Sequence, residues 1–184
     1  MDESRKTVFE TKVLAEIIIF AALSAGLYTL TLPFLTLPFG GSVTAGSMVP
    51  IFWLALRRGH KVGIAGGVIF GLVALFIDIV RLPYSPIAAN PASVLFDYVL
   101  AFGALGAAGL FKKHPLAGVT AASTLKFLSH FVSGVIFWSI YAPEGLSPIV
   151  YSAIYNGSFM TAETVISLIL VYLIIKSKYL KIYM

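Results

Sequence analysis

The chain has 184 residues, of which 59% are hydrophobic and 11% charged, and its formal net charge at pH 7 is +5. A soluble domain usually carries about 25% charged residues and cannot hide so much apolar surface from water, so the composition excludes an ordinary soluble fold. The absence of cysteine excludes a disulfide framework, a thiolate nucleophile and a cysteine metal site. The basic residues lie at the ends of apolar stretches, where membrane topology explains them, so no nucleic-acid partner is expected.

Six apolar stretches follow one another along the chain, and a spanning helix needs roughly 20 mostly apolar residues. We predict an all-α integral membrane bundle of six transmembrane helices within a single membrane-embedded domain, residues 1–184. The helices are expected at about Val13–Phe34, Ser47–Leu56, Val62–Val80, Ala92–Phe111, Leu116–Trp138 and Pro148–Ile175. The first stretch is too long for the apolar core of a signal peptide and is interpreted as a spanning helix. The second is the shortest, and it either begins before Ser47 or does not cross the whole bilayer.

Basic residues are restricted to alternate connectors. All but two of the 13 lysines and arginines lie before the first helix, in the second and fourth connectors, or after the last helix, the exceptions being Arg81 and Lys126. The positive-inside rule assigns that side to the cytoplasm. Both termini, including the segment 1–12, are therefore predicted to be cytoplasmic, in a multi-pass protein of a prokaryotic plasma membrane.

The three outer connectors, residues 37–46, 81–91 and 139–147, are rich in glycine, proline and aromatic residues rather than in charged ones. Two interpretations are open. The connectors pack as a lid over an outward-facing cavity, or their prolines and glycines simply end the helices.

Polar side chains of three predicted helices gather at similar depths on the outer side of the membrane. His130 lies roughly 12 Å below Trp138 at 1.5 Å per residue. The set at similar outer depth comprises Asp97, Tyr98, His130, Trp138, Tyr151 and Asn156. Carboxylates accept hydrogen bonds from amino groups, and aromatic faces attract cations, so this set predicts a site for a flat, cationic or amino-bearing small molecule. The alternative is that these groups bond only to one another and lock the bundle.

Four further ionisable residues lie in the predicted helices, and each has a cost in hydrocarbon. Lys126 and Glu163 lie deeper than the predicted site. We expect them to pair with each other, or Lys126 to reach Asp97. Glu16 and Asp78 lie near helix ends and are assigned to no site.

The first predicted helix carries Ala21 and Ala25, four residues apart. Small residues at this spacing permit close packing against another helix of the same chain or against a partner subunit.

Four stretches carry a resemblance to a known family. They are Ser47–Ile51 running into Ala55–Gly59, Asp97–Phe102, Leu128–Phe137 followed by Tyr141–Gly145, and Tyr151–Ser158. Over about Ala15–Leu168 the sequence resembles the ThiT family, the thiamine-binding S-components of energy-coupling factor (ECF) transporters. The resemblance implies a six-helix protein that binds thiamine in an outward pocket and needs no cofactor. It also implies partners, namely a transmembrane coupling subunit and two cytoplasmic ATPases, and a toppling motion that releases the vitamin.

The resemblance carries ligand-binding roles to particular positions. Tyr98, His130, Trp138, Tyr151 and Asn156 match the family in type and spacing. Asp97 stands where the family usually has glutamate, so the charge is kept on a side chain one methylene shorter.

Other positions match less directly. The family's aromatic residue after the first helix, often tryptophan, is replaced here by Phe34 or Phe39, and Tyr84 corresponds to a tyrosine of an outer loop. Lys126 is a candidate for the pocket floor. The pair Ala21 and Ala25 matches the family's docking surface for the coupling subunit.

Three alternatives to thiamine binding are open. The first is the same role for a thiamine precursor or another vitamin. The second is an intramembrane enzyme, which is disfavoured because the adjacent residues Ser129 and His130 do not face each other on a helix, and because no His-Glu-x-x-His or Gly-x-Ser-x-Gly motif occurs. The third is a purely structural subunit. No Walker-type glycine-rich loop is present, so energy for transport is expected to come from partners.

Overall fold

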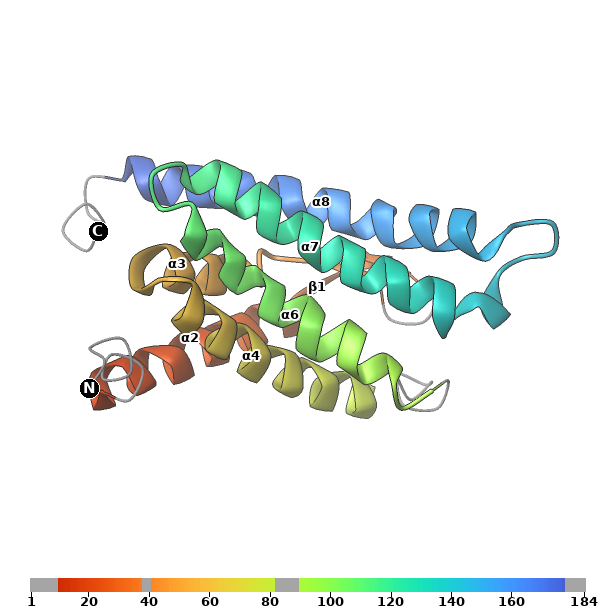
Figure 1. Ribbon diagram of the computed structural model, residues 1–184, viewed down its shortest axis with the longest axis horizontal. Coiled ribbons are helices and arrows are strands. Elements are labelled where there is room, and N and C mark those ends of the chain that lie inside the picture. The colour runs from red at the N-terminus through yellow and green to blue at the C-terminus, as the bar shows by residue number, and fades with distance from the viewer. Residues whose placement is uncertain (1–9, 38–40, 82–89, 178–184) are drawn as a thin grey trace.

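The computed structural model describes residues 10–37, 41–81 and 90–177, with the side chains of 31–36 left out of the description. The elements in chain order are α2 (Thr11–Thr29), β1 (Thr31–Thr36), β2 (Ser42–Thr44), α3 (Val49–Arg58), α4 (His60–Arg81), η2 (Leu95–Leu100), α6 (Ala101–Gly103), η3 (Ala104–Leu110), α7 (Pro115–Ile136), η4 (Ser139–Tyr141) and α8 (Pro148–Lys176). Because η2, α6 and η3 form one continuous segment, the chain has the six principal helical segments that the sequence predicts (Figure 1).

Four helices, α2, α4, α7 and α8, are long and apolar enough to cross a membrane. Their outward faces carry large apolar side chains, such as Ile18, Phe76 and Ile154, which are 62%, 68% and 62% exposed. A monomeric soluble protein rarely exposes so much continuous apolar surface, whereas lipid solvates it without cost. The predicted membrane bundle is therefore confirmed.

The second predicted span does not cross the bilayer as a helix. Helix α3 has 10 residues and is about 15 Å long at 1.5 Å per residue, roughly half of the hydrocarbon core. A two-stranded antiparallel hairpin, in which Thr31 pairs with Thr44, precedes it. Irregular backbone at membrane depth is tolerated only when protein covers it, and Val43 and Ser47 are 4% and 2% exposed. The hairpin was not predicted from the sequence.

A row of glycines on α4 brings the fourth helical segment into backbone contact. A Cβ atom at Gly67 would lie 2.2 Å from the carbonyl oxygen of Phe102, and one at Gly71 would lie 2.3 Å from that of Tyr98. The fourth segment begins with the π-helix η2 and ends with the 3₁₀-helix η3. It is held against α4 at a distance that no larger residue permits. This contact fixes the position of η2, which carries Asp97.

The N-terminal end of α2 and the C-terminal end of α8 lie at the same end of the molecule (Figure 1). At this end Arg58 donates two hydrogen bonds of 2.6 Å to Glu16, and Lys112 Nζ lies 3.3 Å from the carbonyl oxygen of Arg57. The predicted basic connectors thus meet at one end, as an even number of crossings requires. The assignment of that end to the cytoplasm stays a prediction.

Candidate ligand-binding site

Three hydrogen-bond donors converge on the carboxylate of Asp97. Ser133 Oγ donates to Asp97 Oδ2 at 2.7 Å, and Trp138 Nε1 donates to the same oxygen at 3.0 Å. His130 Nδ1 lies 3.1 Å from Asp97 Oδ1 and donates in the tautomer that carries its proton there. The side chains of Asp97 and His130 are 17% and 13% exposed. The structure therefore brings together the predicted carboxylate, imidazole and indole.

Local helix geometry aims these groups at one another. His130 and Ser133 lie three residues apart on α7 and share one face of the helix. Ser129 Oγ donates to the carbonyl oxygen of Phe96 at 2.7 Å, which ties α7 to the π-helix η2. Single π-helical turns occur frequently at functional sites, and here the turn carries Asp97 toward α7.

Helix α8 adds Asn156 from the opposite side. Asn156 Nδ2 lies 3.3 Å from the carbonyl oxygen of His130 and 3.1 Å from that of Ser152. Ser152 Oγ donates to the carbonyl oxygen of Phe131 at 2.7 Å. A Cβ atom at Gly134 would lie 2.2 Å from Ser152 Oγ, so the close approach of α7 and α8 requires glycine there.

An aromatic wall continues the site along α8. The rings of Tyr151 and Tyr155 lie 5.9 Å apart, and those of Tyr155 and Phe159 lie 6.1 Å apart. The ring of Phe159 also lies 5.9 Å from that of His130. The wall therefore joins the predicted Tyr151 to the polar groups around Asp97.

Three members of this arrangement, namely Ser133, Ser152 and Phe159, were not predicted from the sequence. Each lies three or four residues from His130 or Asn156 on the same helix. The spacing of residues that share a helix face was the signal that could have found them.

The hairpin lies along this wall. The backbone N–H of Gly41 donates to Tyr155 Oη at 2.9 Å, and that of Thr44 donates to the carboxylate of Glu163. The first outer connector is thus attached to α8 beside the site, as the lid interpretation requires. The predicted residues Phe39 and Tyr84 lie outside the described residues, and the side chain of Phe34 is not described.

Tyr98 belongs to a separate buried cluster. Its hydroxyl donates to Asp78 Oδ2 at 2.8 Å, and the hydroxyl of Tyr28 donates to the same oxygen at 2.8 Å. Neighbouring positions on a helix point in different directions, so Tyr98 contacts Asp78 while Asp97 contacts α7 and Trp138. Its predicted ligand contact stays a prediction.

The direct ion pair expected for Lys126 is not formed, although its charge interacts with that of Glu163. Lys126 is 5% exposed, and its Nζ lies 4.1 Å from the centroid of the Phe102 ring. Within the described part of the chain, Lys126 makes no ion pair with Glu163 or Asp97. Glu163 bonds the hairpin instead, and Asp97 is occupied by donors of α7 and of Trp138.

The predicted docking pair on α2 is also wrong. Ala21 and Ala25 are 2% and 8% exposed and lie in the core of the chain. Their spacing correctly indicates close packing, but the packing is internal. Ala22 and Gly26, the next positions along α2, are exposed on another face of the helix, as is Ala15 one turn or more before them.

A membrane bundle that holds a carboxylate, an imidazole, an indole and an amide beside an aromatic wall belongs to the class of multi-pass proteins with an internal small-ligand site. The chain belongs to the family described as thiamine transporter protein (Thia_YuaJ), whose sequence model matches residues 14–183.

Two named relatives support this membership. The thiamine transporter ThiT of Bacillus subtilis is 32% identical over 177 residues, covering 88% of each chain. The thiamine transporter ThiT of Lacticaseibacillus paracasei is 31% identical over 140 residues, covering 67% of this chain and 68% of the relative.

A solved structure of ThiT from Listeria monocytogenes has the same fold. It aligns with a TM-score of 0.76 and 23% identity, over 91% of this chain and 94% of its own. The relatives are named transporters rather than enzymes, and the chain is a non-enzymatic, multi-pass protein of the plasma membrane.

Proposed function

We propose that this protein is the thiamine-binding S-component of an ECF transporter, which captures thiamine outside the cell and delivers it with a coupling subunit and two ATPases. The observation that carries the proposal is the Asp97 carboxylate, held by His130, Ser133 and Trp138 beside an aromatic wall. Membership of the thiamine transporter family supports it.

Thiamine offers two features that suit this site, an amino-bearing pyrimidine and a cationic thiazolium ring. An ionised carboxylate has about four acceptor positions, and three donors already contact Asp97. One position therefore remains for the pyrimidine amino group. The faces of Trp138, Tyr151 and Tyr155 would attract the thiazolium cation.

Asp97 is shorter than the glutamate expected at this position from the family resemblance. The donors from α7 and Trp138 fix the orientation of its carboxylate before any ligand arrives. Such preorganisation lowers the entropic cost of binding. The shorter reach is thereby offset by a defined direction.

Transport would depend on partners, because the sequence contains no Walker-type loop. We place the docking face for the coupling subunit on α2, on the side that exposes Ala22 and Gly26. Ile18 and Leu23, 62% and 51% exposed, flank these small residues. Small residues within an apolar face permit close helix approach in a membrane.

Intrinsic fluorescence tests thiamine binding directly. The chain has two tryptophans, and only Trp138 contacts Asp97, while Trp53 is buried in α3. Titration of the purified protein with thiamine is expected to quench fluorescence saturably, and Trp138→Phe is expected to remove most of the change. A folded protein that does not respond to thiamine would contradict the proposal, and a response to the isolated pyrimidine precursor alone would reassign the ligand.

A further inference from the structure

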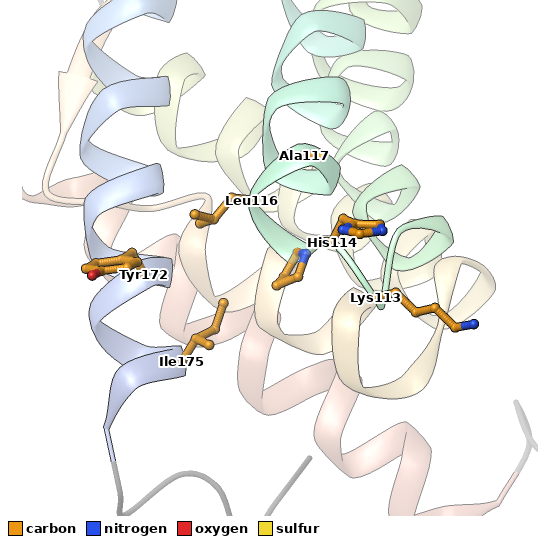
Figure 2. Close-up of a pocket in the computed structure, with 7 residues that line it drawn as sticks. Lys113, His114, Leu116, Ala117, Tyr172 and Ile175 are labelled. Carbon is orange, nitrogen blue, oxygen red and sulfur yellow. The ribbon is translucent and has the colours of Figure 1, made fainter.

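We propose that a groove between the first turn of α7 and the last turn of α8 binds an anionic phospholipid. The groove has a volume of ≈ 390 Å³. Figure 2 shows its lining residues Lys113, His114, Leu116, Ala117, Tyr172 and Ile175. It lies far from the Asp97 site, because the lining residue Pro115 and His130 both lie on α7 and are separated by 15 positions, or about 22 Å of helix.

Among the residues that the structure describes, no carboxylate pairs with the lysines near the groove. Residues 98–143 and 164–184 contain no aspartate or glutamate. Among the described residues, neither Lys113 nor Lys176 forms an ion pair, and Lys176 Nζ lies over the ring of Tyr172, 5.0 Å from its centroid. Lys113 lines the groove and Lys176 lies beside its Tyr172, and both lysines are exposed, so their ammonium groups are available to an anion from outside the chain.

The floor of the groove is apolar, which distinguishes a lipid from a free anion. Leu116, Ala117 and Ile175 contribute hydrocarbon to the lining. On α8 the neighbouring Ile169 and Leu173 are 54% and 55% exposed, so the apolar surface continues toward the membrane. Tyr172 is 42% exposed at the charged end, where aromatic residues favour the membrane interface. A molecule with an anionic head and an apolar tail complements this surface along its length.

Native mass spectrometry of the delipidated full-length protein tests the proposal with phosphatidylglycerol and phosphatidylcholine as probes. We expect a preference for phosphatidylglycerol that falls about fivefold for each lysine removed, in Lys113→Gln and in Lys176→Gln. The matched control is Lys112→Gln, whose ammonium contacts the Arg57 carbonyl rather than the groove, and it should keep the preference. Leu116→Trp fills the groove without changing charge and should lower phosphatidylglycerol retention.

Three results would overturn the proposal: equal retention of the two lipids, an equal loss in Lys112→Gln and Lys113→Gln, or full competition by inorganic phosphate. Thiamine titration of the same samples separates this site from the proposed function. Lys113→Gln should bind thiamine normally, because the groove and the Asp97 site lie at opposite ends of α7.

Discussion

At the scale of single residues, the site depends on how one carboxylate is held inside a membrane protein. A buried carboxylate is costly unless donors surround it. Asp97 has three, all contributed by α7 and the residues that follow it. The donors that stabilise this carboxylate also leave one of its acceptor positions for a ligand, so the same group serves the stability of the bundle and the proposed ligand binding.

Asp97→Asn should therefore weaken thiamine binding. The substitution keeps the shape but removes the charge, and a hydrogen bond to a charged group contributes about 1.5–3 kcal/mol, so we expect a 10- to 100-fold rise in Kd. Asp78→Asn is the matched control, since Asp78 contacts Tyr28 and Tyr98 rather than His130. Isothermal titration of both variants with thiamine measures the change in Kd. Equal losses of affinity in the two variants would remove Asp97 from the proposed site.

The sequence predicted much of this site at the level of residue type and depth. Asp97, His130 and Trp138 were expected together because helical rise places them at similar outer depths, and the structure joins them. Lys126 was misjudged because opposite charge at similar depth does not fix the direction of a side chain. Tyr98 is directed to Asp78 for the same reason: adjacent positions on a helix share a depth but not a face.

At the scale of elements, glycines decide how closely the helices approach. The row on α4 was not predicted, because glycine spacing alone does not identify its partner. In the structure Gly67 meets the Phe102 carbonyl of the fourth helical segment. That segment combines π and 3₁₀ turns. Its close packing against α4 stabilises this irregular backbone.

Gly67→Ala should lower the thermal stability of the protein in detergent. Its Cβ would lie 2.2 Å from the Phe102 carbonyl oxygen, and overpacking of this kind costs about 1–3 kcal/mol. Gly26→Ala on α2 is the matched control, because no atom lies within 4 Å of its added Cβ. It should raise stability slightly, by up to about 1 kcal/mol, through helix propensity. Similar melting temperatures for both variants would show that this contact is not constraining.

The hairpin provides a second prediction at this scale. Glu163 accepts from the Thr44 backbone, and Tyr155 accepts from that of Gly41. Glu163→Gln keeps the shape but weakens the bond to Thr44 by loss of charge. Hydrogen exchange of the Thr44 amide should accelerate, and thiamine should dissociate faster. Unchanged exchange at Thr44, with unchanged dissociation, would show that Glu163 does not hold the hairpin.

At the scale of the whole molecule, one face of α2 packs inward and the other meets the membrane. The sequence indicated a close-packing stripe but could not tell which face it occupied, because both faces of α2 carry small residues. Burial assigns Ala21 and Ala25 to the core and leaves Ala22 and Gly26 exposed. A partner helix can therefore approach the second pair but not the first.

Ala22→Trp should prevent assembly with the coupling subunit while thiamine binding persists. The large side chain would project into the proposed interface, whereas Ala21→Trp would project into the core and should unfold the protein. Co-purification with the coupling subunit and its ATPases measures the first effect, and thiamine titration monitors folding. Normal co-purification of a folded Ala22→Trp variant would exclude this face.

The orientation of the bundle is the remaining whole-molecule prediction, and the lack of native cysteine makes it accessible to labelling. Lys113 and Glu144 are both exposed and lie near opposite ends of α7. If the basic end is cytoplasmic, as the positive-inside rule predicts, a membrane-impermeant maleimide should label Glu144→Cys in intact cells and Lys113→Cys only after permeabilisation. The reverse pattern would place the Asp97 site near the inner surface, and an outward-facing substrate-capture role would then be untenable.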